Sequence, residues 1–148
     1  MFRRDYSQVG NNPASQFGSQ GTGEGLFNYP SSVACNLRGE IVVADYDNRR
    51  VQVFDRNGEF MLKFGSPGNG NDQFNRPCGL TVDQRNNQIV VADTGNHRIL
   101  IFDDKGTFLR VFGSKGQGDG QFTNPVVSSS TSWEITLCLI LETIAFRF

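Results

Sequence analysis

Short apolar runs separated by polar turns recur along most of the chain. Residues 89–92 and 99–102 are apolar or β-branched runs of strand length. Between them, residues 93–98 contain the Asp, Gly and Asn that favour a turn. The pattern therefore predicts a strand, a tight turn and a second strand over residues 89–102.

This hairpin is part of a repeat. Residues 41–54 read IVVADYDNRRVQVF and residues 89–102 read IVVADTGNHRILIF, 48 positions later. A Phe-Gly-Ser triplet, a Phe and a Pro also recur at steps of 47 and 48 residues, at Phe17, Phe64 and Phe112, at Phe27, Phe74 and Phe122, and at Pro30, Pro77 and Pro125. Periods of about 40 to 50 residues with four short strands are typical of β-propeller blades, and the glycine-rich pattern is too strand-like for a helical solenoid. We predict an all-β, incomplete propeller of about two and a half four-stranded blades.

The repeat divides the chain into five parts. We expect a polar leader with the end of a preceding blade at 1–16, repeats at 17–63 and 64–111, the start of a further repeat at 112–125, and a divergent tail at 126–148. The strands expected in the first repeat cover residues 32–35, 40–44, 50–54 and 60–63, with Asn57-Gly58 as the last hairpin turn. The glycine loops, such as residues 65–70, are expected to be inter-blade linkers with positive φ. They are not phosphate-binding loops, because they lack the Lys-Ser/Thr ending and open no helix.

The tail departs from the repeat. After Pro125 a serine-rich stretch leads into an apolar segment at 135–146, which is shorter than the roughly 20 residues of a membrane span and contains Glu142. We interpret the tail as foreign to the repeat, as in a truncated or alternatively spliced product. The alternative is a divergent strand that covers the edge of the last blade.

Composition excludes several classes of protein. The net charge is −1, so no global attraction to nucleic acid or membrane is expected. Three Cys without Cys-x-x-Cys spacing argue against a disulfide framework and a zinc site, and we expect no metal, no cofactor and no small-molecule substrate. Cys35 is aligned with Val82 and is expected to be a small core residue. The N-terminus has no apolar core for a signal peptide, which indicates an intracellular, cytoplasmic protein without a membrane association.

Residues that recur in every unit are expected to build the blade. Asp45 with Arg50, and Asp93 with Arg98, flank the β-turn at the same spacing. A carboxylate and a guanidinium placed in this way predict a structural pair that brackets the turn and satisfies its backbone groups.

Function is expected where the units differ. In a four-stranded blade the turn between the second and third strands lies on the same rim as the link between blades. The candidate binding residues that this rim collects are Tyr29, Tyr46, Arg49, Arg76, His97 and Lys115. Aromatic side chains stack on bases and Arg contacts phosphates or base edges, as recognition of single-stranded RNA requires. An ordinary solvated rim is the alternative, and the nearby Asp47, Asp72 and Asp119 weaken its basic character.

The FGSxGxGxGxFxxP and IVVADxxNxR motifs resemble the NHL repeat, most closely that of the TRIM-NHL proteins, over about residues 15–125. A WD-repeat propeller is disfavoured, because neither a Gly-His nor a Trp-Asp dipeptide occurs. The resemblance implies an NHL-type propeller, usually of six blades, and several such propellers bind RNA on this rim. The RING and B-box zinc modules of TRIM proteins cannot be built from three Cys and one His, so no ubiquitin-ligase activity is implied.

These observations lead to a non-catalytic binding module for single-stranded or hairpin RNA in post-transcriptional regulation. The alternative is a protein-interaction scaffold, such as the substrate-recruiting part of a TRIM-type ubiquitin ligase. An enzyme is disfavoured: amidating lyases resemble NHL propellers but depend on metal-binding histidines and oxidised cysteines, and His97 has no partner set for catalysis or metal binding.

Overall fold

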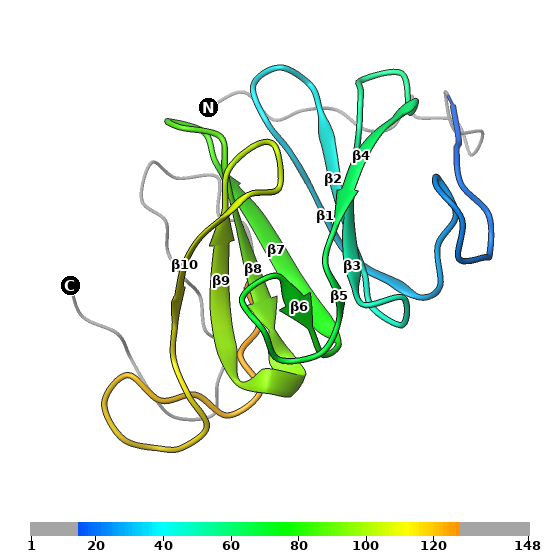
Figure 1. Ribbon diagram of the computed structural model, residues 1–148. Coiled ribbons are helices and arrows are strands. Elements are labelled where there is room, and N and C mark those ends of the chain that lie inside the picture. The colour runs from blue at the N-terminus through cyan, green and yellow to red at the C-terminus, as the bar shows by residue number, and fades with distance from the viewer. Residues whose placement is uncertain (1–14, 128–148) are drawn as a thin grey trace, which may run out of the picture.

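The computed structural model describes residues 15–127 as two four-stranded antiparallel sheets that pack face to face (Figure 1). The first sheet has the order β1 (Pro30–Cys35), β2 (Ile41–Asp45), β3 (Arg50–Phe54) and β4 (Phe60–Phe64). The second has the order β7 (Pro77–Asp83), β8 (Gln88–Asp93), β9 (Arg98–Phe102) and β10 (Phe108–Phe112). Each sheet follows the chain order from one edge to the other, as in a propeller blade.

The expected strands of the first repeat are present, with shifted ends. The first expected strand begins two residues earlier, at Pro30, because Pro30 already pairs with Asp45 across a bulge. The second begins at Ile41 and continues to Asp45, which pairs with Arg50. The structure therefore places the carboxylate and the guanidinium of each repeat opposite one another at the end of a hairpin.

The linker between the blades and the turn between β8 and β9 carry structure that the sequence did not predict. Strands β5 (Ser66–Pro67) and β6 (Gln73–Phe74) form a short parallel pair, and a 3₁₀ turn, η1 (Thr94–Asn96), follows β8. Gly65 in the same linker has a φ of 93°, and a Cβ there would lie 2.3 Å from the Phe74 ring. Only glycine fits at this point, where backbone and ring approach so closely.

The core lies between the two sheets. One face of the first sheet contributes Val42, Ala44, Val51 and Val53, and the facing side of the second contributes Leu80, Val82, Ile89, Val91, Leu100 and Phe102. Phe74 from the linker completes this cluster. A second cluster on the far face of the second sheet includes Phe122, from the start of the further repeat, and Val127, from the first residues of the expected tail. The edge strands β1 and β7 lie side by side, joined by the Ser31 hydroxyl, which donates to the Pro77 carbonyl at 2.8 Å.

The expectation for Cys35 is wrong. Cys35 is exposed, whereas Val82, which is aligned with it, is 6% exposed. The reason is what lies against each side chain. Val82 faces the first sheet, but Cys35 and Val33 lie on the opposite face of that first sheet, where no described sheet covers them.

The interpretations of residues 1–14 and of the tail beyond residue 127 lie outside the described residues. Within the described part, no helix is long and apolar enough to cross a membrane.

Candidate functional site

Each Asp–Arg pair ties a blade to the linker that precedes it. Asp45 and Arg50 are buried, and Arg50 Nε donates to Asp45 Oδ2 at 2.9 Å. The other guanidinium nitrogens of Arg50 donate to the carbonyls of Thr22, Gly23 and Leu26 at 2.8 Å. Because the guanidinium fork is planar and extends past the carboxylate, the backbone groups that it satisfies belong mainly to the linker, not to the turn as expected.

The second blade repeats this arrangement. Arg98 Nε donates to Asp93 Oδ2 at 2.8 Å, and its fork reaches the carbonyls of Asn69, Gly70 and Gln73. Asp93 also accepts from the Asn75 backbone N–H at 2.7 Å. The linker between the blades is therefore held at a fixed place on the rim.

The residues before the first strand of a blade and the turn after its second strand lie at the same end of the sheet. Pro30 pairs with Asp45, and Pro77 with Asp93. The Tyr46 N–H donates to the Tyr29 carbonyl at 3.3 Å, and the Gly95 N–H donates to the Asn75 carbonyl at 2.8 Å. We call this end the linker rim; it carries Tyr29, Tyr46, Arg49, Arg76 and His97.

The linker rim collects left-handed backbone at residues other than glycine. Six such residues are described in the chain, and five of them lie here: Tyr29 (φ 57°), Arg49 (52°), Arg76 (57°), His97 (55°) and Asn124 (50°). Glycine takes this conformation easily and asparagine and histidine are enriched in it, whereas a Tyr or Arg is destabilised in it. Bulky side chains thus stand where the backbone favours smaller ones, which is the kind of strain that gathers at functional sites.

The structure brings some candidate residues together and leaves others apart. The rings of Tyr29 and Tyr46 meet edge to face, with centroids 5.6 Å apart. Arg49 and Asn75, the neighbour of Arg76, line one depression. His97 Nδ1 accepts the Asn124 backbone N–H at 3.2 Å, one repeat further along. Lys115 lies in the next linker, bridged to Phe122, and contacts none of the other candidates through a described interaction.

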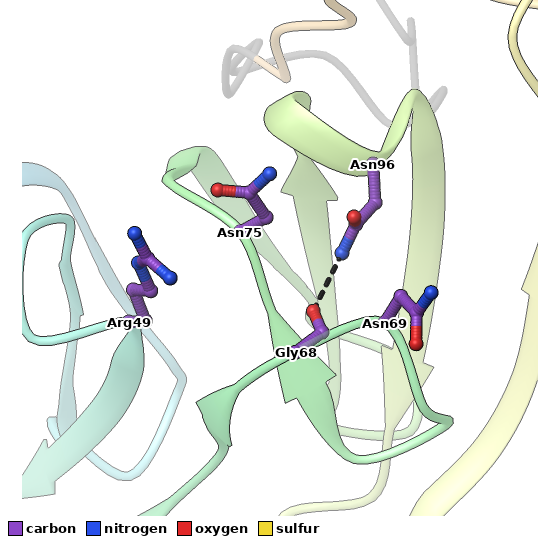
Figure 2. Close-up of a pocket in the computed structure, with 5 residues that line it drawn as sticks. All are labelled: Arg49, Gly68, Asn69, Asn75 and Asn96. Atoms are coloured by element: carbon purple, nitrogen blue, oxygen red, sulfur yellow. Dashed lines mark hydrogen bonds between the residues drawn. The ribbon is translucent and has the colours of Figure 1, made fainter.

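A depression of about 370 Å³ lies on the linker rim where the two blades meet. Figure 2 shows Arg49, directly before β3, on one side, Asn96 on the other side, and Asn75 between them. Gly68 and Asn69 of the linker complete its wall. Its volume is at the lower end of the roughly 300–1,000 Å³ of small-molecule sites.

The depression contains residues that sequence reasoning missed. Asn69, Asn75 and Asn96 lie in it, but none of them was a candidate. Asn96 recurs as Asn48 in the first repeat, so variation between units could not single it out. Asn69 and Asn75 do differ between units, because Gln117 and Thr123 stand at their places in the next linker. Buried Gln52, which replaces Leu100 of the second repeat, was also missed; it binds the N–H of Gly25 and the carbonyl of Leu26.

The candidate cations on and near the linker rim have no carboxylate partner in the described part of the chain. In the described part of the chain, Arg49, Arg76 and Lys115 form no ion pair. The opposite rim differs, because Arg38 there pairs with both Glu40 and Asp104, which raises the pKa of Arg38 and lowers that of Glu40. No group of His, Cys, Asp and Glu suited to a metal ion is present among residues 15–127.

Comparison with known families decides the identity of the repeat. The family model described as the NHL repeat matches residues 27–54 and 74–102. These two stretches are NHL repeats. Together with the two sheets, they make the described chain two blades of an NHL-type β-propeller and the first segment of a third.

The relatives confirm the resemblance to TRIM-NHL proteins. Protein brain tumor of Drosophila melanogaster is 42% identical over 67 residues, which is 45% of this chain and 6% of that protein. Protein lin-41 of Caenorhabditis elegans is 44% identical over 61 residues, 40% of this chain and 5% of that protein. The E3 ubiquitin-protein ligase TRIM71 of Rattus norvegicus is 47% identical over 60 residues, 40% of this chain and 7% of that protein. The chain thus spans a small part of each relative.

Among solved structures, the calcium-binding protein regucalcin of Agrobacterium tumefaciens aligns with a TM-score of 0.47 and 17% identity. The alignment covers 68% of this chain and 34% of that one.

Proposed function

We propose that this NHL protein is a non-catalytic binding module that recognises single-stranded or hairpin RNA through its linker rim, in post-transcriptional regulation. The observation that carries the proposal is the left-handed backbone at Tyr29, Arg49 and Arg76. A rim that served only to turn the chain would be more stable with Gly or Asn at these positions. The side chains themselves are therefore the reason for their presence.

The chemistry of these side chains fits RNA. Tyr29 is 71% exposed, and its ring can stack on a base while the edge of Tyr46 supports it. Arg49 and Arg76 have no carboxylate partner among the described residues, so both are available to phosphates or base edges. The free thiols Cys35 and Cys78 fit a reducing compartment, and we place this function in the cytoplasm.

A double substitution tests the proposal. Binding of fluorescein-labelled single-stranded RNA is measured by anisotropy for the full chain, for Arg49→Ala with Arg76→Ala, and for Arg56→Ala with Arg110→Ala. The control pair removes the same charge from exposed positions away from the linker rim. We expect the first pair to lose about tenfold or more in affinity and the control to stay within about twofold. Equal losses in both pairs, or none in either, would contradict the site.

Contact with a partner protein is the second candidate function. Val33 is 60% exposed and Leu37 is 81% exposed, on β1 and the turn that follows it. Such apolar side chains favour a protein partner over a polyanion. Salt separates the two candidates: RNA binding through phosphates weakens steeply as salt rises, with a slope of about −0.7 per phosphate contact for single strands, whereas an apolar interface does not.

A further inference from the structure

One wall of the depression between the blades holds a fixed acceptor, the side-chain oxygen of Asn96. Asn96 Nδ2 donates to Asp93 Oδ2 and to the Gly68 carbonyl, both at 2.8 Å. These two bonds use the amide donors and fix the orientation of the group, so Oδ1 of Asn96 remains as an acceptor. Since Asp93 is itself held by Arg98, this orientation is determined by the buried network beneath the rim.

Asn75 adds an adaptable amide on a rigid backbone. Its N–H donates to Asp93 Oδ1, and its carbonyl accepts from the Gly95 N–H. Both backbone groups are thus engaged, while the side-chain amide binds no other residue of the described chain (Figure 2). Asn75 can therefore turn either its oxygen or its nitrogen toward a ligand.

Across the depression from Asn96 lies a cationic donor, the guanidinium of Arg49. Arg49 lies between the blades with a φ of 52°, and its guanidinium pairs with no described carboxylate. A guanidinium presents parallel N–H donors that match two adjacent acceptors, whereas a lysine ammonium is a single point charge. The depression thus offers paired donors on one side and amide acceptors on the other.

We propose that this depression binds a guanine base of the RNA, with Arg49 as the residue that determines specificity; this rests on the proposed function. Guanine carries two adjacent acceptors, O6 and N7, on one edge, and its N1–H and N2–H donors on the next edge. Adenine and uracil have no two adjacent acceptors on one edge, and cytosine, whose N3 and O2 are adjacent acceptors, has only one exocyclic donor beside them, where guanine has two neighbouring N–H donors. Arg49 binds O6 and N7, while the oxygens of Asn96 and Asn75 accept from the other edge.

The experiment compares matched probes. Labelled oligouridine, and the same oligonucleotide with one central guanosine, adenosine or 7-deazaguanosine, are titrated onto the full chain at fixed salt. We expect guanosine to bind about tenfold more tightly than adenosine, the size of one bidentate contact. We expect 7-deazaguanosine, which lacks the N7 acceptor, to lose most of this advantage.

Arginine-to-lysine variants identify the residue that determines the preference for guanosine. Arg49→Lys keeps the charge but loses the fork, so we expect its affinity for the guanosine probe to fall about tenfold relative to its affinity for the adenosine probe, which removes the preference for guanosine. Arg56→Lys, at an exposed position away from the linker rim, should keep that preference. Circular dichroism melting confirms that both variants fold.

The outcomes separate the two proposals. If RNA binds equally well whichever base is central, or if adenosine is preferred, the guanine site is wrong while the RNA function stands. If the preference survives in Arg49→Lys, Arg49 does not determine it. If none of the probes binds, the RNA function fails, and the guanine site with it.

Discussion

At the scale of single residues, the linker rim shows that the repeat determines the backbone conformation at a position without determining the side chain there. Tyr29, Arg76 and Asn124 occupy the same place in three successive units, and all three have φ between 50° and 57°. The backbone conformation belongs to the repeat, because it recurs whatever the side chain. The side chain varies from Tyr to Arg to Asn, so each unit presents a different chemistry on an unchanged turn.

Substitutions of Arg76 test this separation. Arg76→Asn installs the residue that the next unit already carries at Asn124, and we expect the free energy of unfolding to rise by about 0.5 kcal/mol, because Asn adopts left-handed backbone at lower cost. Arg76→Val should lower it by about 1 kcal/mol, because a β-branched side chain clashes in this conformation. Urea denaturation followed by circular dichroism measures both.

Both Arg76 variants are expected to bind RNA more weakly than the parent. A gain in stability with a loss of binding in Arg76→Asn would show that the arginine is retained for its side chain. If Arg76→Asn were less stable than the parent, strain at this position would not be the basis of the site.

At the scale of elements, each blade ends in the same β-hairpin turn. Asp55 accepts the backbone N–H groups of Asn57 and Glu59, and Asp103 those of Lys105 and Thr107. The bonds from Glu59 and Thr107 are the main causes that lower the pKa of Asp55 and of Asp103, respectively. A lowered pKa in the folded state means that the ionised carboxylate stabilises the hairpin.

The pH dependence of the free energy of unfolding follows from the lowered pKa values of these two carboxyl groups. The contribution of Asp55 and Asp103 is fully present above the unfolded-state pKa of about 3.9, and it is lost as the pH falls through the lower folded-state values. We expect Asp55→Asn with Asp103→Asn to be less stable than the parent at pH 7 and to differ less from it at pH 2 to 3. Urea midpoints measured across this range test the prediction, and a constant difference would contradict it.

At the scale of the whole molecule, stability depends on one sheet covering the next. Leu80 of the second sheet faces the first and is 1% exposed, whereas Val33, in the equivalent place of the first sheet, is 60% exposed. The repeat thus places the same kind of residue in two environments. Burial, which decides the energetic value of an apolar side chain, is a property of the assembled sheets.

A matched pair of truncations measures this difference. Leu80→Ala leaves a cavity between the sheets, and we expect it to lower the free energy of unfolding by about 2–5 kcal/mol. Val33→Ala removes an exposed side chain and should change it by less than about 0.5 kcal/mol. Thermal and urea unfolding of the full chain give both values; similar losses would show that the face carrying Val33 is covered in solution.

The sequence by itself determined the repeat, the four strands of each blade and the resemblance to the NHL repeat, because alternating apolar residues, turn residues and their period are local properties of the chain. It also pointed to Asp45 with Arg50 and Asp93 with Arg98, which recur at a fixed spacing and are joined in the structure. Only the tertiary structure showed that these pairs hold the linker, since the carbonyls that they bind lie 24 to 29 residues away in the chain.

The tertiary structure alone also decided which residues share the depression between the blades. Arg49 comes from one blade, Asn96 from the next and Asn75 from the linker, and no local pattern predicts that packing brings them together. The exposure of Cys35 was likewise decided at this level, because alignment places it on a core position but only a neighbouring sheet can bury it. Period and composition determine the blade; the contacts between blades determine its site.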